Sequence, residues 1–310
     1  MINDLASGER ILWRNVPSWR FKGEGWSFSS LRLSFIWLPS RSGCKGITPC
    51  DKQESHLLER DLDIHGFCVI PQLLSKEERG SIRLHQRRHG NEILRSGTWM
   101  KGRAAVDPFY HRLVSDERFL AVLRPLLGPD IIHWGLDILT RRPGEVHPWH
   151  CDMESCTPAG GFISIWIGLS RTSARSSLKL ISRSHRFACT VQEDAHRHGF
   201  ARGQASDEII AGWARKRDPK AELVMPKLRD GDALIFDGRL WHGSRNSQRW
   251  FTRRAMLMQY ARSDRSVRMP QSFGWPIALN ETERPPVMIV SGAGSSPGNL
   301  VVAPPRDLKI

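Results

Sequence analysis

Several kinds of sequence signal are missing from this chain of 310 residues, and each absence excludes a class of protein. Six cysteines occur, but there is no Cys-x-x-Cys pair and no regular spacing, so the sequence indicates neither a zinc ribbon nor a disulfide-linked scaffold. No run of about 18 apolar residues is present, which argues against a membrane-spanning helix. Charged residues interrupt the N-terminus, so no signal peptide is predicted. We therefore expect a cytoplasmic protein without a membrane partner.

Clustered charge is also missing, although the composition is basic. There are 46 Lys and Arg against 32 Asp and Glu, a formal net charge of +14. This balance suits binding to nucleic acid, to an anionic membrane surface or to an anionic small molecule, and equally a basic enzyme without any such partner. The arginines are spread along the chain, and no block of five or six like charges occurs. Such blocks are typical of nucleic-acid-binding tails, so no nucleic-acid partner is expected.

The residues that are present indicate one large domain with flanking segments. Apolar residues make up 40% of the chain, and 12 Trp and 12 Phe supply bulky core material. Residues 51–265 carry regular patterns, within which residues 190–222 are predicted to form a lid or insert. Residues 266–310 are predicted to be a C-terminal tail. Residues 1–50 form an arm whose role is left open between a substrate lid, a partner-binding arm and a translation-start artefact. The oligomeric state is not indicated.

Helical patterns come first in the domain, and strand patterns follow. Helices are predicted at residues 55–63, 75–97, 116–127 and 207–216. Strands rich in Ile, Leu, Phe and Trp are predicted at residues 66–71, 131–140, 162–169, 178–181, 233–236 and 253–260. Ser75 and Glu78 have the spacing of a capping box at the start of the second helix. This order predicts an α+β, mainly β, fold with a double-sheet core.

The stretch from Val146 to Asp152 suggests a metal site. In extended backbone, side chains alternate between faces, so His150 and Asp152 share one face while Cys151 points to the other. His242, which follows a later strand, supplies a second imidazole. Two histidines and one carboxylate on one face of a metal leave open positions for oxygen and a chelating co-substrate on ferrous iron. The joint pattern carries this prediction, because a lone His-x-Asp triplet is more often structural.

Arg253, on the strand after His242, is predicted to bind an anionic co-substrate. A guanidinium binds a carboxylate through two parallel hydrogen bonds, and a charge inside an apolar β core needs a partner. Alternation places Arg253 with Ala255 and Leu257 on one face of the strand, and Arg254 with Met256 on the other. One arginine of the pair is therefore expected to be exposed, and Arg253 is preferred as the inward one.

Taken together, these residues resemble the phytanoyl-CoA dioxygenase family of non-haem iron oxygenases over about residues 55–265. The matching stretches are His65–Pro71, Trp149–Asp152, Ile165–Leu169, Ser184–Arg186, Gly231–Asp232, His242–Ser244 and Arg253–Ala255. The resemblance implies a double-stranded β-helix (a jelly roll, cupin-like) with N-terminal and flanking helices. It also implies Fe(II) bound by His150, Asp152 and His242, with 2-oxoglutarate and O2 as co-substrates. The family often has Pro-Gly-Ser-His where this chain has Ser182–His185, so that turn is expected to differ.

The same resemblance implies roles for the co-substrate residues and for the reaction. Arg253 and Ser244 would bind the distal carboxylate of 2-oxoglutarate, and Trp166 would line its pocket, although the residue pattern alone makes Trp166 a core residue. Asp152 stands where related halogenases have Gly or Ala. The resemblance therefore implies hydroxylation, or another halide-free oxidation, of an unactivated C–H bond, with succinate and CO2 as co-products. We expect a small-molecule substrate of secondary metabolism rather than a fatty acyl-CoA, partly because Asp307–Ile310 is not a peroxisomal Ser-Lys-Leu signal.

The substrate itself is not identified by the sequence, but two segments are expected to contact it. These are residues 100–103 and the insert at 190–222, because loops over a rigid scaffold usually set specificity. They carry Lys101, Arg103, Arg197 and Arg202, so an anionic substrate is an expectation, against the alternative that these charges are merely solvated.

Three other functions stay open at this point. A nucleic-acid demethylase of the same chemistry resembles a pattern with a second arginine six residues after the first, where this chain has Gln259. A non-catalytic or zinc-binding jelly roll could use Cys151 and Cys156, although alternation turns Cys151 away from His150. A basic RNA- or membrane-binding module would need clustered charge that the sequence does not show.

Overall fold

The computed structural model describes residues 52–96, 99–152, 159–271, 274–275, 277–280, 282–292 and 295–306. The predicted N-terminal arm and Cys156 lie outside the described residues. In the described part of the chain, no helix is both long and apolar enough to cross a membrane.

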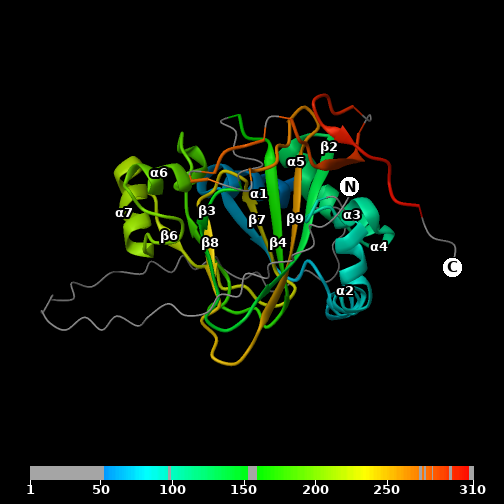
Figure 1. Ribbon diagram of the computed structural model, residues 1–310, viewed down its shortest axis with the longest axis horizontal. Helices are drawn as coiled ribbons and strands as arrows, with labels where there is room; N and C mark the ends of the chain where they lie inside the picture. The colour runs from blue at the N-terminus through cyan, green and yellow to red at the C-terminus, as the bar shows by residue number, and fades with distance from the viewer. Residues whose placement is uncertain are drawn as a thin grey trace, which may run out of the picture. The chain divides into compact units, whose positions relative to one another are not determined.

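Two sheets form the centre of the described domain (Figure 1). The large sheet has seven strands in the order β1–β7–β4–β9–β2–β10–β11, antiparallel except for the β10–β11 pair, and the small antiparallel sheet has four in the order β3–β8–β5–β6. The strands are β1 (Phe67–Ile70), β2 (Ile131–Arg141), β3 (Val146–His150), β4 (Phe162–Ser170), β5 (Leu178–Ile181), β6 (Leu223–Val224), β7 (Ala233–Asp237), β8 (His242–Arg245), β9 (Arg253–Arg262), β10 (Pro286–Ser291) and β11 (Leu300–Val301). The predicted α+β class with a double-sheet, jelly-roll core is confirmed.

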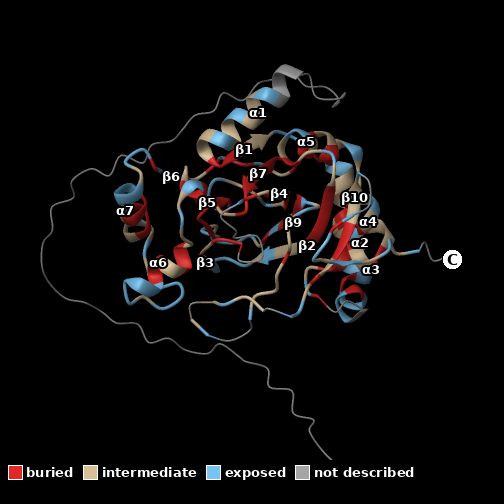
Figure 2. Cartoon of the chain, turned by 90° about the horizontal axis from the view of Figure 1, so that it is seen from above, coloured by how far each residue is buried: buried red, intermediate tan, exposed pale blue. Residues whose placement is uncertain are grey.

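Helices cover the outer faces of both sheets (Figure 2). They are α1 (Lys52–His65), α2 (Lys76–Ser96), α3 (Arg103–Val106), α4 (Pro108–Val114), α5 (Glu117–Leu127), α6 (Val191–Arg197) and α7 (Asp207–Arg217), with the 3-10 turn η2 at Ser184–Arg186. The Ser75 hydroxyl accepts from the backbone N–H of Glu78 at 3.2 Å, and the Glu78 carboxylate accepts from the N–H of Ser75 at 2.8 Å. This reciprocal pair is the predicted capping box.

The central strand β4 contributes side chains to two separate cores, one on each face of the large sheet. Ile163, Ile165 and Ile167 point outward and join the core under helices α2–α5, whereas Trp166 points inward toward the small sheet. Because both faces of β4 are covered, the strand reads as a continuous apolar run rather than an alternating one. Strand β9 follows the predicted alternation: Met256 and Met258 lie in the outer core, while Ala255 faces inward.

Residues 190–222 form α6 and α7, which pack on the outer face of the small sheet (Figure 1). Their apolar contacts include Trp149 on β3 and Trp213 on α7. The predicted helix at 207–216 is confirmed as α7. In the turn expected to differ from the family, Arg183 adopts φ +68°, a backbone conformation that favours glycine. Arg183 forms an ion pair with Asp218 in this conformation.

The segment expected to be a C-terminal tail contributes β10 to the large sheet. Met288 lies opposite His133 and Ile289 opposite Ile132 in an antiparallel pair with β2. The large sheet therefore continues beyond residue 265. The sequence also did not predict several short elements, namely strands β3, β6, β8 and β11 and helices α3, α4 and α6.

Candidate metal centre

The three predicted metal ligands come together between the sheets. His150 at the end of β3 lies opposite His242 at the start of β8. Directly opposed residues of an antiparallel pair point to the same face, and the two ring centroids are 4.0 Å apart. Asp152 follows β3, and its Oδ1 lies 3.9 Å from Nε2 of His150 and 3.8 Å from Nε2 of His242. Within the described residues, this trio is the group with the spacing of metal ligands, its ligand atoms all lying within 4.8 Å of one another.

Backbone carbonyls fix which nitrogen of each imidazole faces the cluster. Nδ1 of His150 lies 2.9 Å from the carbonyl oxygen of Pro148, and Nδ1 of His242 lies 2.8 Å from that of Leu240. A carbonyl oxygen only accepts, so each Nδ1 carries the hydrogen and each Nε2 presents a lone pair. Burial, and then the neighbouring His242 and His147, hold the pKa of His150 well below its ordinary value. His150 is therefore neutral at physiological pH, the form that binds a metal.

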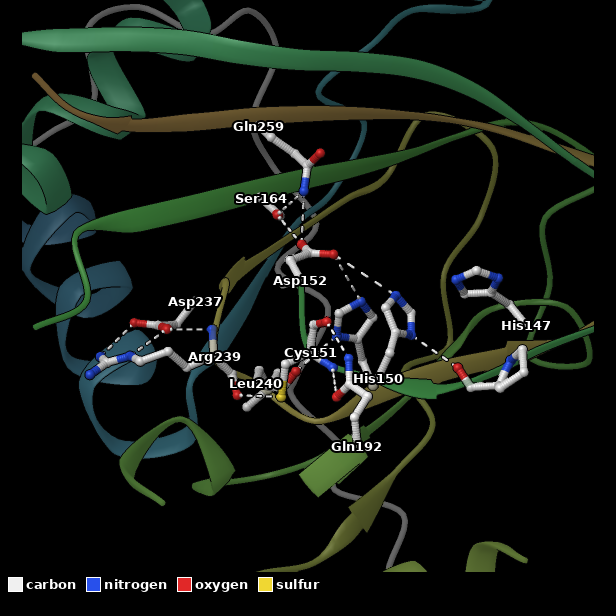
Figure 3. A network of polar contacts seen from close by, with 12 residues as sticks. His147, His150, Cys151, Asp152, Ser164, Gln192, Asp237, Arg239, Leu240 and Gln259 are labelled. Atoms are coloured by element: carbon white, nitrogen blue, oxygen red, sulfur yellow. Dashed lines mark hydrogen bonds and ion pairs between the residues drawn. The ribbon is translucent and has the colours of Figure 1, made fainter. Parts of the chain in front are cut away.

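Two side chains of the large sheet orient the carboxylate of Asp152 (Figure 3). Its Oδ2 accepts from the Ser164 hydroxyl at 2.8 Å and from the Gln259 amide at 2.9 Å, while Oδ1 faces the imidazoles. Ser164 on β4 and Gln259 on β9 lie directly opposite each other, so one cross-strand pair supplies both donors. Gly135 on β2 makes room for this amide, because a Cβ there would lie 2.9 Å from Oε1 of Gln259.

Sequence reasoning missed Ser164, and it considered Gln259 only as a position without the second arginine. The available signal was alternation along β9, which puts Gln259 on the inward face that Arg253 also occupies. Its partner could not be read from the sequence, because the β4–β9 register is a long-range property.

Cys151 points away from the cluster, as alternation predicts. Its thiol contacts the carbonyl oxygen of Arg239 at 3.3 Å, and its backbone N–H and C=O both bond to the side-chain amide of Gln192 on α6 at 2.9 Å (Figure 3). The Gln192 amide thus holds the end of β3 in place. Cys151 lies on the wrong face to complete a zinc site with His150.

A cavity of about 920 Å³ opens beside the cluster. Its walls include the three ligands and the three residues predicted to bind the co-substrate, Trp166, Ser244 and Arg253. Arg253 is 1% exposed, whereas Arg254 is exposed on the other face of β9. The structure thus places Arg253, and not Arg254, in the cavity.

The guanidinium of Arg253 is held by neutral groups. Its Nε donates to the carbonyl oxygen of Ser176 at 3.1 Å, and Nη2 lies 3.5 Å from the Ser244 hydroxyl. Nη1 has no hydrogen-bond partner, and the guanidinium carbon lies 5.2 Å from the ring centroid of Trp166. Burial, with a contribution from nearby Arg141, lowers the pKa of Arg253 to about 10. A buried cation without a carboxylate is costly, and an anion entering the cavity would offset that cost.

The four cations expected at the substrate face divide into two pairs. Lys101 and Arg202 line the cavity. Arg103 is buried and forms an ion pair with Asp137 at 3.2 Å, so its charge is neutralised inside the protein. Arg197 lies 3.5 Å from Asp194 and is not among the cavity-lining residues. Arg141, which was not predicted, also lines the cavity.

The family model described as phytanoyl-CoA dioxygenase (PhyH) matches residues 62–255, well over half of the chain. The chain belongs to the phytanoyl-CoA dioxygenase family. The matched span contains the three candidate ligands together with Trp166, Ser244 and Arg253, and it ends before Gln259. No curated protein matches the sequence at a significant level.

Several solved structures of similar fold are named as non-haem enzymes. The non-haem monooxygenase ThoJ is 18% identical, over 80% of this chain and 88% of its own, with a TM-score of 0.56. The epimerase SnoN, solved with Fe3+, alpha ketoglutarate and nogalamycin RO, is 17% identical over 74% and 95%, with a TM-score of 0.50. The carbocyclase SnoK from nogalamycin biosynthesis is 20% identical over 72% and 89%, with a TM-score of 0.51. At these identities the likeness establishes a shared fold.

Proposed function

We propose that this member of the phytanoyl-CoA dioxygenase family is an Fe(II)- and 2-oxoglutarate-dependent oxygenase that oxidises an unactivated C–H bond of a small molecule, with succinate and CO2 as co-products. One observation carries the proposal. A two-histidine, one-carboxylate cluster shares a cavity with Arg253, a buried guanidinium that has no carboxylate partner among the described residues. A structural zinc site would explain the cluster but not the arginine.

The residues of the cavity fit the two groups. His150, Asp152 and His242 would hold the iron, and their neutral imidazoles and single carboxylate suit a divalent ion with open coordination positions. Arg253 and Ser244 would bind the distal carboxylate of 2-oxoglutarate, beside Trp166. Iron and 2-oxoglutarate, when bound, supply the activation of O2 that oxidises the substrate. The protein orients these groups and keeps water away, and the three ligands have no acid–base role.

Hydroxylation or another halide-free oxidation is the proposed outcome. Asp152 supplies a carboxylate at the third ligand position, whereas related halogenases free that position for a halide. The carboxylate is also fixed by Ser164 and Gln259, which supports a ligand role. The similar structures include a monooxygenase, an epimerase and a carbocyclase, so an assay for this protein should measure succinate and not one chosen product.

We further propose that the substrate is an anion with an apolar body, from the charge balance of the cavity. Iron and Asp152 together leave one positive charge, Arg253 adds another, and the 2-oxoglutarate dianion cancels both. The wall also contains Lys101, Arg141 and Arg202, while its other carboxylate, Asp137, pairs with Arg103. Arg141 contacts the carbonyl oxygen of Thr140 at 3.0 Å and Nδ1 of His147 at 3.1 Å, neither of which is an anion.

Another part of the cavity wall is apolar. Trp99, Met269 and Trp275 line it, so the cavity combines a cationic side with an aromatic and aliphatic one. A carboxylate or phosphate on a hydrophobic skeleton would fit both sides. Small secondary metabolites bearing an acid group are the substrate class that we infer.

The cofactor assignment is tested by anaerobic titration of the purified protein with Fe(II) and 2-oxoglutarate. We expect the weak visible charge-transfer band of an iron–2-oxo acid chelate. His150→Ala should abolish the band, and His147→Ala, which removes a neighbouring imidazole outside the cluster, should keep it. A native protein that gives no band, or that holds zinc stoichiometrically against chelators, would contradict the proposal.

The substrate class is tested by a succinate-release screen with carboxylic acids and their neutral amides in matched pairs. We expect the acids to stimulate succinate release. Arg202→Gln should raise the KM for an active acid about tenfold or more, as the loss of a charge-assisted hydrogen bond implies. Arg197→Gln, which removes a cation from the same insert but outside the cavity, should leave that KM unchanged. Equal stimulation by acids and amides would contradict the inferred substrate class.

A further inference from the structure

Three loops that are distant in sequence meet at one end of the sheets. They join β2 to β3, β4 to β5, and β8 to β9, and the β8–β9 loop projects below the strands in the view of Figure 1. The N–H of Ser247 donates to the carbonyl oxygen of Arg175 at 2.7 Å, and the Gln248 amide donates to that of Arg171 at 2.7 Å. The Asn246 amide donates to the carbonyl oxygen of Arg141 at 2.9 Å. The β8–β9 loop is thus tied to both of the others.

These loops and the adjoining strand ends gather six exposed arginines, which we call the arginine tip. Its members are Arg142, Arg171, Arg175, Arg245, Arg249 and Arg254. Arg254 lies opposite both Thr140 and Ser170 in the large sheet, and Arg245 lies opposite Val146 in the small sheet, so the cluster spans both sheets. None of the six lines the cavity that contains the metal cluster.

Two large aromatic side chains stand among these arginines. Trp250 is 72% exposed and Phe251 is 44% exposed. The guanidinium of Arg249 lies 4.5 Å from the ring centroid of Trp250, and that of Arg171 lies 4.2 Å from the ring centroid of Phe251. Adjacent exposed aromatic residues mark interaction surfaces more often than chance exposure does.

The positive charge of the arginine tip is not neutralised within the described part of the protein, where none of its six members forms an ion pair. Two nearby carboxylates bond to backbone N–H groups of the tip and not to its guanidinium groups. Glu145 accepts from the N–H of Arg142 at 2.7 Å, and Asp230 accepts from that of Arg171 at 3.1 Å and pairs with Arg79 at 3.6 Å. Like charges gathered at one end of the sheets repel one another, so an anionic partner would stabilise the tip.

We propose that the arginine tip docks on an anionic phospholipid surface, with Trp250 in the headgroup layer. Tryptophan favours that layer because its ring is apolar and its N–H is polar, and arginines beside it attract anionic lipids. The proposal is independent of the chemistry in the cavity. It differs from the sequence-based expectation of no membrane partner, which depended on the absence of a long apolar run and of charge clusters along the chain.

Two other partners fit the arginine tip less well. Bases of single-stranded nucleic acid stack on aromatic faces, but one face of each ring is already covered by a guanidinium. A second copy of the chain docked through the same surface would bring two sets of arginines face to face. That arrangement is disfavoured by Coulomb repulsion.

The test is sedimentation of the whole protein with phosphatidylcholine vesicles that contain or lack phosphatidylserine. We expect binding only when phosphatidylserine is present, weakening as salt is raised. Each arginine near an anionic surface contributes about fivefold to the partition coefficient, so Arg175→Gln combined with Arg249→Gln should lower it about 25-fold. Arg87→Gln combined with Arg88→Gln, which removes two exposed arginines from α2, should change it by no more than about twofold.

A second pair of variants tests the aromatic contribution. Trp250→Ala should weaken binding, while Leu94→Ala, which truncates an exposed apolar side chain on α2, should not. Thermal unfolding followed by circular dichroism confirms that each variant is folded.

Four results would each overturn the proposal. These are no binding to phosphatidylserine vesicles, equal binding to neutral vesicles, equal effects of the tip and α2 variants, and undiminished binding by Trp250→Ala. Binding of an oligothymidine in place of vesicles would reassign the tip to nucleic acid. Self-association that the Arg175 and Arg249 substitutions abolish would reassign it to a second copy.

Discussion

Replacing Gln259 by methionine is expected to weaken metal binding without unfolding the protein. The substitution keeps the length and volume of the side chain but removes the amide that donates to Oδ2 of Asp152 at 2.9 Å. A hydrogen bond to a charged group contributes about 1.5–3 kcal/mol, and loss of a residue that orients a metal ligand typically weakens metal affinity about 10–100-fold. Because Ser164 still donates to the same oxygen, we expect about tenfold.

The stability of the metal-free protein should change little, because two contributions oppose each other. The variant loses one donor to a buried carboxylate, but it also loses Oε1 of Gln259, a buried oxygen that has no hydrogen-bond partner. The assay is anaerobic competition for Fe(II) against a chelating dye, beside thermal unfolding of the metal-free protein. Met258→Leu is the matched control, since residue 258 is buried on the opposite face of β9.

Two results would refute this reasoning. Fe(II) affinity within twofold of the wild type would show that the amide does not position Asp152. A loss of affinity that only follows a large drop in the melting temperature of the metal-free protein would assign Gln259 a general packing role. Adding Ser164→Ala to Gln259→Met should weaken Fe(II) binding further, by about another tenfold.

Three further predictions concern other parts of the molecule. Arg253→Gln should weaken 2-oxoglutarate binding by about 30-fold or more in calorimetry while Fe(II) binding persists, and Arg254→Gln should leave both unchanged. Ser75→Ala removes the cap of α2 and should lower the free energy of unfolding in urea by about 1 kcal/mol, whereas Ser81→Ala in the same helix should cost less than about 0.5 kcal/mol. Burial lowers the pKa of His133 from 6.5 to about 3. The unfolded chain therefore binds a proton below about pH 6.5 that the folded chain does not, and stability falls by about 1.4 kcal/mol per pH unit from this group. His133→Phe should reduce the slope of unfolding free energy against pH by that amount between about pH 6 and 4, and an unchanged slope would contradict the assignment.

Much of the candidate site could be predicted from the sequence alone, because side chains alternate between the two faces of a strand. This alternation predicted the shared face of His150 and Asp152, the opposite direction of Cys151, and the opposite faces of Arg253 and Arg254, of which Arg253 was preferred as the inward one. Each of these depends on a period of two residues, which is a local property of the backbone. The capping box at Ser75 is equally local, and it was also found.

Properties that depend on register between distant strands were not predictable in this way. Ser164 and Gln259 meet only because β4 and β9 pair with those residues opposite each other. Strand β10 was overlooked because its short apolar run follows a long stretch without pattern, and its pairing with β2 spans much of the chain. The arginine tip escaped notice for the same reason, since its residues are adjacent in space but scattered in sequence.

The position of Asp152 has a consequence for the protein without its metal. One oxygen of this carboxylate faces His150 and His242 of the small sheet, and the other accepts hydrogen bonds from Ser164 and Gln259 of the large sheet. A metal ion bound to all three ligands would therefore link the two sheets. Strand β3, which carries His150, is an edge strand of the small sheet. Edge strands expose unpaired backbone groups that recruit other chains, and Pro148 within β3 limits this by removing one donor. Loss of the ion would remove this link between the sheets and leave Gln192 as the main hold on the end of β3, so we expect iron-depleted preparations to aggregate before they unfold.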